Sequence, residues 1–231
     1  MADFFKSLLD IVSSNLTIVV FIAACGLFLA VIMEQLQILA KYDGAMKAKV
    51  ASGYNSAMKI MVINRLGAVL YFVFVAFAID TGISPQRLSS FFIGTICALA
   101  VVNIGVFSVY FRRFKTELTA EVRSAGRVEH KRQEDLLALC VFAATMLNLL
   151  GLTIPLLLSA KFPDYRMTLS NTGFLFNTLF TIINVFIIEN YLAKLIDKKD
   201  DRLHRIVVSI LGIRILGQAG AIGLLMLVAF A

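Results

Sequence analysis

The sequence predicts an all-α, polytopic integral membrane protein with six transmembrane helices. Hydrophobic residues make up 59% of the 231 residues and charged residues only 16%, whereas soluble domains carry about 25% charged residues. The mean hydropathy is correspondingly high, at +0.85. The charges gather in short clusters between long apolar runs, and each run approaches or exceeds the roughly 20 residues that a helix needs to cross a bilayer.

Six such runs follow one another, and none shows the alternation of apolar and polar residues that is typical of a transmembrane barrel. Lipid offers no hydrogen-bond partners, so a helix is expected because it satisfies its own backbone. The six predicted spans are Asn15–Leu39, Met58–Asp80, Phe91–Phe111, Leu136–Leu158, Thr172–Leu192 and Ile206–Phe230.

The first run contains Ile-Ala-Ala-Cys at residues 22–25, which resembles a lipoprotein cleavage site. However, the preceding segment carries Asp3 and Asp10 as well as Lys6, and the apolar run continues past the cysteine. We therefore interpret the run as a first helix and not as a cleaved signal. Cys25, Cys97 and Cys140 all lie in apolar runs, without metal-binding spacing, and are interpreted as small packing residues.

The connections differ strongly in positive charge. Of the 22 lysines and arginines, 16 lie in the three odd-numbered connections and four lie at the N-terminus or in the even-numbered connections. Positively charged connections face the cytoplasm, so both termini are predicted to lie outside it. The net charge of +7 is then explained by topology and by anionic lipid headgroups, and does not indicate binding to nucleic acid.

The longest polar connection covers residues 112–135 and mixes basic with acidic side chains. It is expected to extend the third and fourth helices into the cytoplasm as a charged hairpin. Two roles are open for this hairpin: a solvated, lipid-facing surface, or a docking site for a partner.

Four ionisable residues lie inside predicted helices, namely Glu34, Arg65, Glu189 and Arg214. A charge at the centre of a membrane helix costs about 2.5–3.5 kcal/mol on insertion scales, which makes such residues functional candidates. Glu34 and Arg65 have similar depths on the first and second helices, as Glu189 and Arg214 do on the fifth and sixth. We therefore predict two ion pairs, Glu34–Arg65 and Glu189–Arg214, which either fix helix register or belong to a binding site.

Amide side chains lie at similar depth on several helices. On the fifth helix, Asn177, Thr181 and Asn184 share one face, with Glu189 about 120° away from it. Asn103 and Asn148 lie on the third and fourth helices. Each amide alone is explained by contacts between helices. Their joint placement predicts a cavity that opens to the cytoplasm.

The sequence contains no motif that predicts catalysis, a metal site or a cofactor. His130 and His204 are expected in connections, without a partner at metal-ligand spacing. Neither a nucleophile turn nor a glycine-rich phosphate loop occurs. Transport or binding is therefore expected, and not enzymatic activity.

Two stretches resemble the Amj-type lipid II flippases, the bacterial alternates to MurJ. The first stretch runs from Glu34, through Ala40, Gly44 and Ser56, to Arg65 and Asp80. The second begins at residues 162–166 (Phe-Pro-Asp-Tyr-Arg) and continues through Asn177 to residues 197–198 (Asp-Lys). Together they cover about half of the chain. The chain departs from the family pattern at Thr178, where the family has glycine.

The resemblance implies movement of lipid II, an undecaprenyl-diphosphate-linked disaccharide pentapeptide, from the inner to the outer leaflet of a bacterial cytoplasmic membrane. Guanidinium groups suit a diphosphate, the two glutamates would hold the arginines while the site is empty, and amides suit sugar. Two other classes remain open: a small-ion or small-solute carrier, and a non-transporting subunit of a cell-envelope complex. The predicted headgroup site comprises Arg65, Arg214, Glu34, Glu189, Asn177, Asn184, Asn148 and Gln218.

Overall fold

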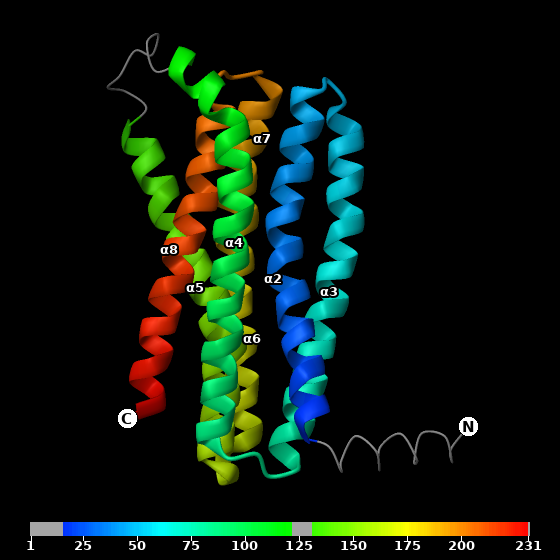
Figure 1. Cartoon of the computed structure of the whole chain (residues 1–231), viewed down its shortest axis with the longest axis vertical. Helices are drawn as coiled ribbons and strands as arrows, with labels where there is room; N and C mark the ends of the chain where they lie inside the picture. Colours follow the sequence, from blue (N-terminus) through cyan, green and yellow to red (C-terminus); the bar gives the residue numbers. More distant parts are fainter. Residues whose placement is uncertain (1–15, 122–130, 231) are drawn as a thin grey trace, which may run out of the picture.

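A computed structural model describes residues 16–121 and 131–230, and the regular structure of this part of the chain is entirely helical. It contains six helical spans that are long and apolar enough to cross a membrane, which confirms the predicted fold class. Figure 1 shows them as a bundle of long, roughly parallel rods. The helices are α2 (Leu16–Met46), α3 (Val50–Asp80), α4 (Pro85–Glu121), α5 (Lys131–Lys161), α6 (Arg166–Ile182), α7 (Asn190–Asp197) and α8 (Leu203–Phe230).

The fifth span is composite. A single 3₁₀ turn, η1 (Pro163–Tyr165), precedes α6, and a π-helical segment, η2 (Ile183–Glu189), joins α6 to α7. Several helices extend well beyond the apolar runs that predicted them, above all at the end with the basic connections, which we call the basic end. The backbone ladder continues there through polar residues until a turn interrupts it. At the α2–α3 turn Ala48 has a φ of 53°, and at the α7–α8 turn Lys199 has a φ of 47°.

The conformation of the connection between α3 and α4 is determined by the residues of the connection itself. Gly82 follows α3 with a φ of +85°, a conformation that glycine adopts at low cost. Pro85 then opens α4, at a position where its missing N–H is not needed. The Ser84 hydroxyl accepts a hydrogen bond of 3.4 Å from the backbone N–H of Arg87, which caps the new helix.

The helices α2 and α3 form an antiparallel hairpin whose backbones touch at two glycine pairs. A methyl group added to Gly26 would lie 2.8 Å from the carbonyl oxygen of Gly67, and one added to Gly44 would lie 2.6 Å from the Cα of Gly53. Small residues allow such close approach in lipid, where helices gain little from burying apolar surface.

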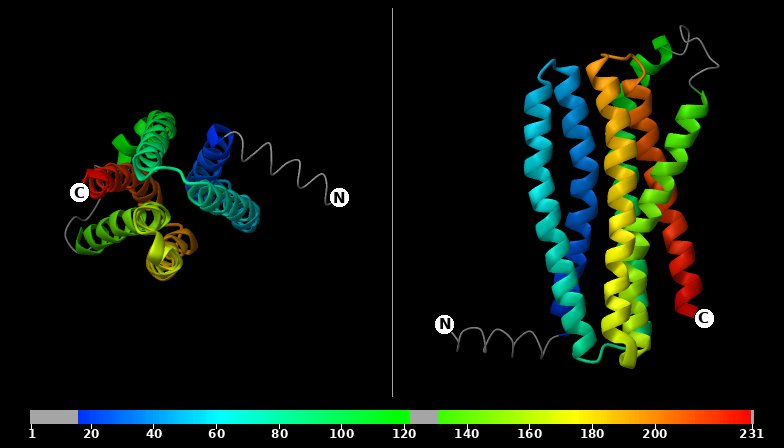
Figure 2. Two further views of the ribbon diagram at one scale, coloured as in Figure 1. Left: turned by 90° about the horizontal axis from the view of Figure 1, so that it is seen from below. Right: turned by 180° about the vertical axis from the view of Figure 1, so that it is seen from behind.

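The other helices form a second group. In this group α5 packs against both α6 and α8, and α4 packs against α8. The hairpin touches this group over a smaller area, through contacts of α2 with α4 and α8 and of α3 with α5. The view along the bundle shows the α2–α3 pair standing beside the remaining helices (Figure 2).

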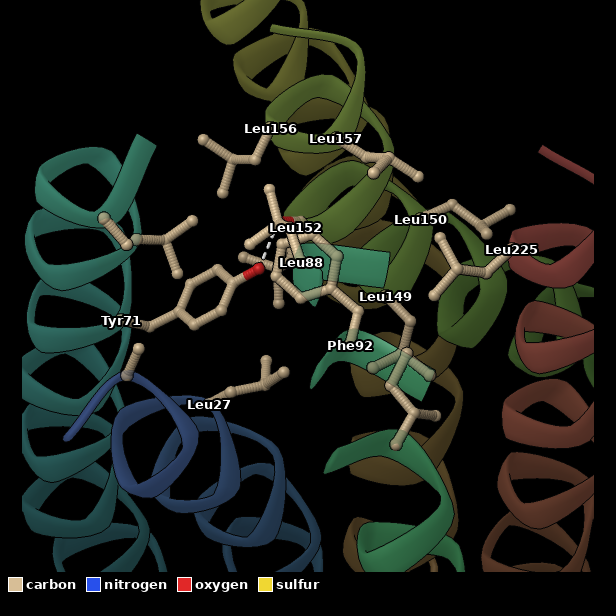
Figure 3. Packing of buried hydrophobic residues seen from close by; sticks show 14 of the residues in the cluster. Leu27, Tyr71, Leu88, Phe92, Leu149, Leu150, Leu152, Leu156, Leu157 and Leu225 are labelled. Carbon is tan, nitrogen blue, oxygen red and sulfur yellow. Dashed lines mark hydrogen bonds between the residues drawn. The ribbon is translucent and has the colours of Figure 1, made fainter. Parts of the chain in front are cut away.

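Buried apolar side chains form two clusters, one toward each end of the bundle. The cluster at the end opposite the basic connections is centred on Leu27, Tyr71, Phe92 and Leu149, all at most 1% exposed. Figure 3 shows Tyr71 directed toward α5, where its hydroxyl donates a 2.6 Å hydrogen bond to the carbonyl oxygen of Leu152. This cluster joins the hairpin to the second helix group and fills that end of the protein.

Large apolar side chains also cover the outside of the bundle. Phe21, Val101, Phe174 and Leu227 are each exposed over two thirds or more of their surface. Such exposure on every side is expected where the solvent is lipid. Cys25 and Cys97 are exposed on apolar faces as well, in agreement with their interpretation as packing residues in a membrane.

The predicted charged hairpin at 112–135 lies partly outside the described residues. The backbone of α4 continues to Glu121, and α5 begins at Lys131. Residues 122–130, including His130, are not described.

Candidate functional site

A cavity of about 230 Å³ lies between the α2–α3 hairpin and the α5–α6 pair. Two of its lining residues belong to the buried cluster around Tyr71 or pack against it, namely Leu152 and Phe72, and they form the floor of the cavity. The polar lining residues extend from this floor toward the basic end. They are Glu34, Gln37, Lys41, Asn64, Arg65, Asn148, Asn177, Thr181, Asn184 and Glu189.

Eight of these ten lie on regular α-helices, one of them being Asn148 on α5. Glu34, Gln37 and Lys41 recur on α2 at intervals of three and four residues, and Asn64 and Arg65 are adjacent on α3. Asn177 and Thr181 are one turn apart on α6. The cavity therefore arises where the polar stripe of α2 faces that of α6 across a gap bordered by α3 and α5.

The π-helical segment brings Glu189 to the same cavity as Asn184, which corrects the predicted 120° separation. In an α-helix, five residues turn through about 500°, which leaves the two side chains far apart around the axis. A π-helix bonds residue i to i+5, so its turn takes one residue more and the two side chains come nearly into line. Sequence periodicity assumes a constant turn and cannot detect this change.

Glu34 pairs with Arg214 of α8, with 2.8 Å between Oε1 and Nη2. Its other oxygen, Oε2, accepts a 2.9 Å hydrogen bond from the side-chain amide of Asn148 on α5. The Arg214 side chain is 4% exposed and that of Glu34 is 14% exposed. Three helices therefore meet at one carboxylate.

The predicted Glu34–Arg65 pair is wrong because depth alone does not decide which side chains meet. The face of α3 that packs on α2 contains Gly67 and Tyr71, and Asn64 on the same side donates a hydrogen bond to the carbonyl oxygen of Ala30. Arg65 follows Asn64 and is therefore rotated by about 100° from that face. Its side chain is exposed and borders the cavity from the side.

The predicted Glu189–Arg214 pair is also wrong, and Glu189 pairs instead with Lys41 of α2. Because α5 packs between α6 and α8, it separates the helix segment that carries Glu189 from Arg214. The Lys41 and Glu189 side chains are 14% and 20% exposed. The Lys41 ammonium also lies 5.4 Å from the centre of the Tyr54 ring, a cation–π contact.

Both ion pairs therefore join the hairpin to the second helix group, whereas the prediction placed each within one hairpin. Among the charged residues of the cavity, all within the described part of the chain, Arg65 has no carboxylate partner. Arg214, which was predicted to belong to the site, does not line the cavity but binds Glu34 from behind it. The lining itself has two cationic groups, Lys41 and Arg65, and two carboxylates, Glu34 and Glu189, so the positive charge of Arg214 is additional to a balanced lining.

Gln218 was predicted to belong to the site, but it does not line the cavity. It is fully buried on α8, one turn from Arg214, and both of its amide atoms are without a hydrogen-bond partner. Atoms of Gln35, Asn103 and Arg214 are also buried without a partner. Buried amides in such positions bind internal water where space allows.

Lys41, Gln37 and Asn64 were not among the predicted site residues. Lys41 was attributed to a connection because it marks the charged end of the first apolar run, yet α2 continues beyond it to Met46. The spacing of Glu34, Gln37 and Lys41 was the signal that could have shown that they share a face.

His204 was expected in a connection, and this is wrong as well. It lies in the first turn of α8, is 4% exposed, and shares a 2.7 Å hydrogen bond with the Tyr42 hydroxyl on α2. This contact gives the basic end a third link between hairpin and bundle. Within residues 16–121 and 131–230, no three histidine, cysteine, aspartate or glutamate side chains come together as metal ligands.

The fold and the cavity define a polytopic helical membrane protein with a polar site, lined by both acidic and basic side chains, in one half of its thickness. Comparisons with protein-family models, curated proteins and solved structures found no match to the chain.

Proposed function

We propose that the protein is a lipid flippase that moves a lipid with a diphosphate-linked headgroup across a membrane. The observation that carries this proposal is Arg65, a cation at the edge of the cavity that no carboxylate within residues 16–121 and 131–230 neutralises. Arginine binds phosphate oxygens through two parallel hydrogen bonds and keeps its charge in lipid surroundings. The same cavity is lined by the side-chain amides of Asn177 on α6 and Asn184 on η2, which can donate hydrogen bonds to such an anion.

The lateral position of Arg65 favours a lipid over a small solute. Leu66, Val62 and Val69 surround it on α3 and are each 58–59% exposed. A lipid can therefore place its headgroup phosphate at Arg65 while its chain stays on the apolar flank of α3. A free ion would need a polar route through the half of the bundle opposite the basic end, and the buried apolar cluster fills that half.

The size of the cavity limits which part of a headgroup enters it. Its volume is about 230 Å³. This is enough for a diphosphate and too small for a disaccharide pentapeptide. In the proposed mechanism, the sugars and peptide of lipid II therefore remain outside the cavity, at the basic end, until the hairpin moves.

The orientation and location belong to the same proposal. By the positive-inside rule, the basic end faces the cytoplasm, and the cavity then opens toward the leaflet where lipid II is made. The resemblance to Amj-type flippases points to lipid II and to the bacterial inner membrane.

The test is transport by the variant Arg65→Gln in proteoliposomes that contain fluorescent lipid II. We expect the rate to fall at least tenfold, with unfolding unchanged within about 0.5 kcal/mol because Arg65 is exposed and unpaired. Arg87→Gln is the matched control, since Arg87 is also exposed and lies in the first turn of α4, at the opposite end and outside the cavity. Lipid movement by Arg65→Gln at the normal rate would falsify the proposal.

A second arm separates the lipid from small solutes. Ion currents or solute uptake by the wild-type protein, without lipid II movement, would favour a carrier. In cells, the gene is expected to restore growth when the resident lipid II flippase is depleted.

A further inference from the structure

A second pocket lies at the basic end, away from the proposed transport site. Its volume is about 460 Å³, and it is bounded by the first turns of α5, by the end of η2 with α7, and by the α7–α8 turn. It shares no lining residue with the cavity that holds Arg65. We call it the interfacial pocket.

The walls of the interfacial pocket change from apolar to basic along the membrane normal. On one wall, Ile187 comes first, Tyr191 follows one turn later, and Lys194 and Lys198 follow at the end of the helix. On the other wall, Leu136 lies deeper than Gln133. Leu136 is 59% exposed and Ile187 is 39% exposed, so apolar surface is open to the membrane below the charged rim.

The rim is held in place by a network of ion pairs. Arg202 Nη2 lies 2.6 Å from Asp200 Oδ2, and Arg205 Nη2 lies 2.6 Å from Glu134 Oε1 on α5. The hydrogen bond with Asp200 raises the pKa of Arg202. These contacts fix the α7–α8 turn against the start of α5.

Positive charge remains after this pairing. Among the described contacts, Lys194 and Lys198 have no carboxylate partner, whereas Arg202 Nη1 is buried without a hydrogen bond, 4.0 Å from Glu134 Oε1. Among the described residues that line the pocket, two lysines without a carboxylate partner therefore stand beside the Arg202 guanidinium, and the one acidic side chain, Asp200, is already bound by Arg202. This arrangement suits an anion with several oxygen atoms.

We propose that the interfacial pocket binds an anionic phospholipid, with its phosphate at Lys194, Lys198 and Arg202 and an acyl chain along Leu136 and Ile187. Free phosphate has the same oxygen atoms, but it has no acyl chain that could contact the apolar lower wall. Basic pockets between helices at a charged membrane face recognise lipid headgroups in this way, and tyrosine favours the boundary between chain and headgroup. A bound lipid would fasten α5 to α7 and so stiffen the helix that carries Glu189.

The experiment measures thermal unfolding of the full-length protein in neutral detergent with added phosphatidylglycerol, phosphatidylcholine or inorganic phosphate. Phosphatidylglycerol is expected to raise the Tm, and the two other additions are expected to leave it unchanged. For the variant Lys194→Gln/Lys198→Gln, the affinity for phosphatidylglycerol should fall about 25-fold.

The matched control is Lys49→Gln/Lys59→Gln, which removes the same charge from exposed lysines at the same end. This variant should keep the phosphatidylglycerol affinity of the wild type. An equal loss of phosphatidylglycerol affinity in both variants would show that the lipid is attracted by basic residues in general, and it would contradict binding in the pocket. Stabilisation by inorganic phosphate alone would overturn the lipid as its occupant. Neither result depends on lipid II movement, so the flippase proposal is tested separately.

Discussion

Glu34 is the residue on which the hairpin and the second helix group converge. Its carboxylate binds Arg214 through one oxygen and the amide of Asn148 through the other. In a membrane interior, a carboxylate is tolerated when a cation and hydrogen bonds compensate its charge. Arg65 differs from Arg214 because it is exposed and unpaired, so the two arginines should respond differently to the same substitution.

Arg214→Gln leaves the Glu34 carboxylate buried without a counter-charge. Loss of one partner of a buried pair costs about 3–5 kcal/mol, and we expect a loss of this size in equilibrium unfolding in mixed micelles. The double variant Glu34→Gln/Arg214→Gln should recover most of it, because no charge stays unpaired. Equal stability of Arg214→Gln and the wild type would contradict the pairing.

At the scale of the element, glycine positions set the distance between α2 and α3. A methyl group on Gly26 would lie 2.6 Å from the backbone nitrogen of Tyr71, closer than real side chains come to backbone. The backbone cannot yield as a flexible side chain can. Gly94 on α4 offers the contrasting case, since nothing lies within 4 Å of the corresponding methyl group.

Gly26→Ala should therefore destabilise the protein by about 1–3 kcal/mol, the usual penalty of overpacking. Gly94→Ala should be neutral or slightly stabilising, because alanine is the better helix former. The free energies of unfolding of the two variants are compared by reversible unfolding in the same detergent. If Gly26→Ala were as stable as Gly94→Ala, the close glycine contact would not exist.

At the scale of the whole molecule, the hairpin and the second helix group are linked at both ends and separated by the cavity between. The basic end has the Lys41–Glu189 and Glu34–Arg214 pairs and the Tyr42–His204 bond. The other end has the apolar cluster and the Asp80–Arg166 pair. Proposed transport requires these links to open in turn, since the cavity is too small for the whole headgroup.

A chemical cross-link at the basic end should therefore arrest transport. The variant Lys41→Cys/Glu189→Cys, in a background without Cys25, Cys97 and Cys140, provides the two thiols. A short bismaleimide is expected to reduce lipid II movement at least tenfold, relative to the same variant before treatment. A monofunctional maleimide, which modifies both thiols without joining them, is the control. Undiminished transport by the cross-linked protein would mean that the two parts need not separate.

The sequence predicted the fold class, the number of spans and six of the ten polar residues that line the cavity. Asn148, Asn177, Asn184, Glu34, Arg65 and Glu189 were all chosen for the energetic penalty of polar groups in lipid. Asn64 and Lys41 were missed, the first because one amide alone is unremarkable and the second because it was assigned to the connection after the first span. The η2 segment was not predictable, because its wider turn breaks the period on which the prediction rests.

The sequence by itself determined that six helices cross the membrane and that their polar groups gather toward the basic end. Both properties depend on the apolar length of each segment and on backbone hydrogen bonds within it, which are local. Only the tertiary structure decided which charges meet, as Glu34 with Arg214 and Glu189 with Lys41. Partner choice depends on how helices distant in sequence rotate and pack, and two side chains at equal depth can face opposite directions.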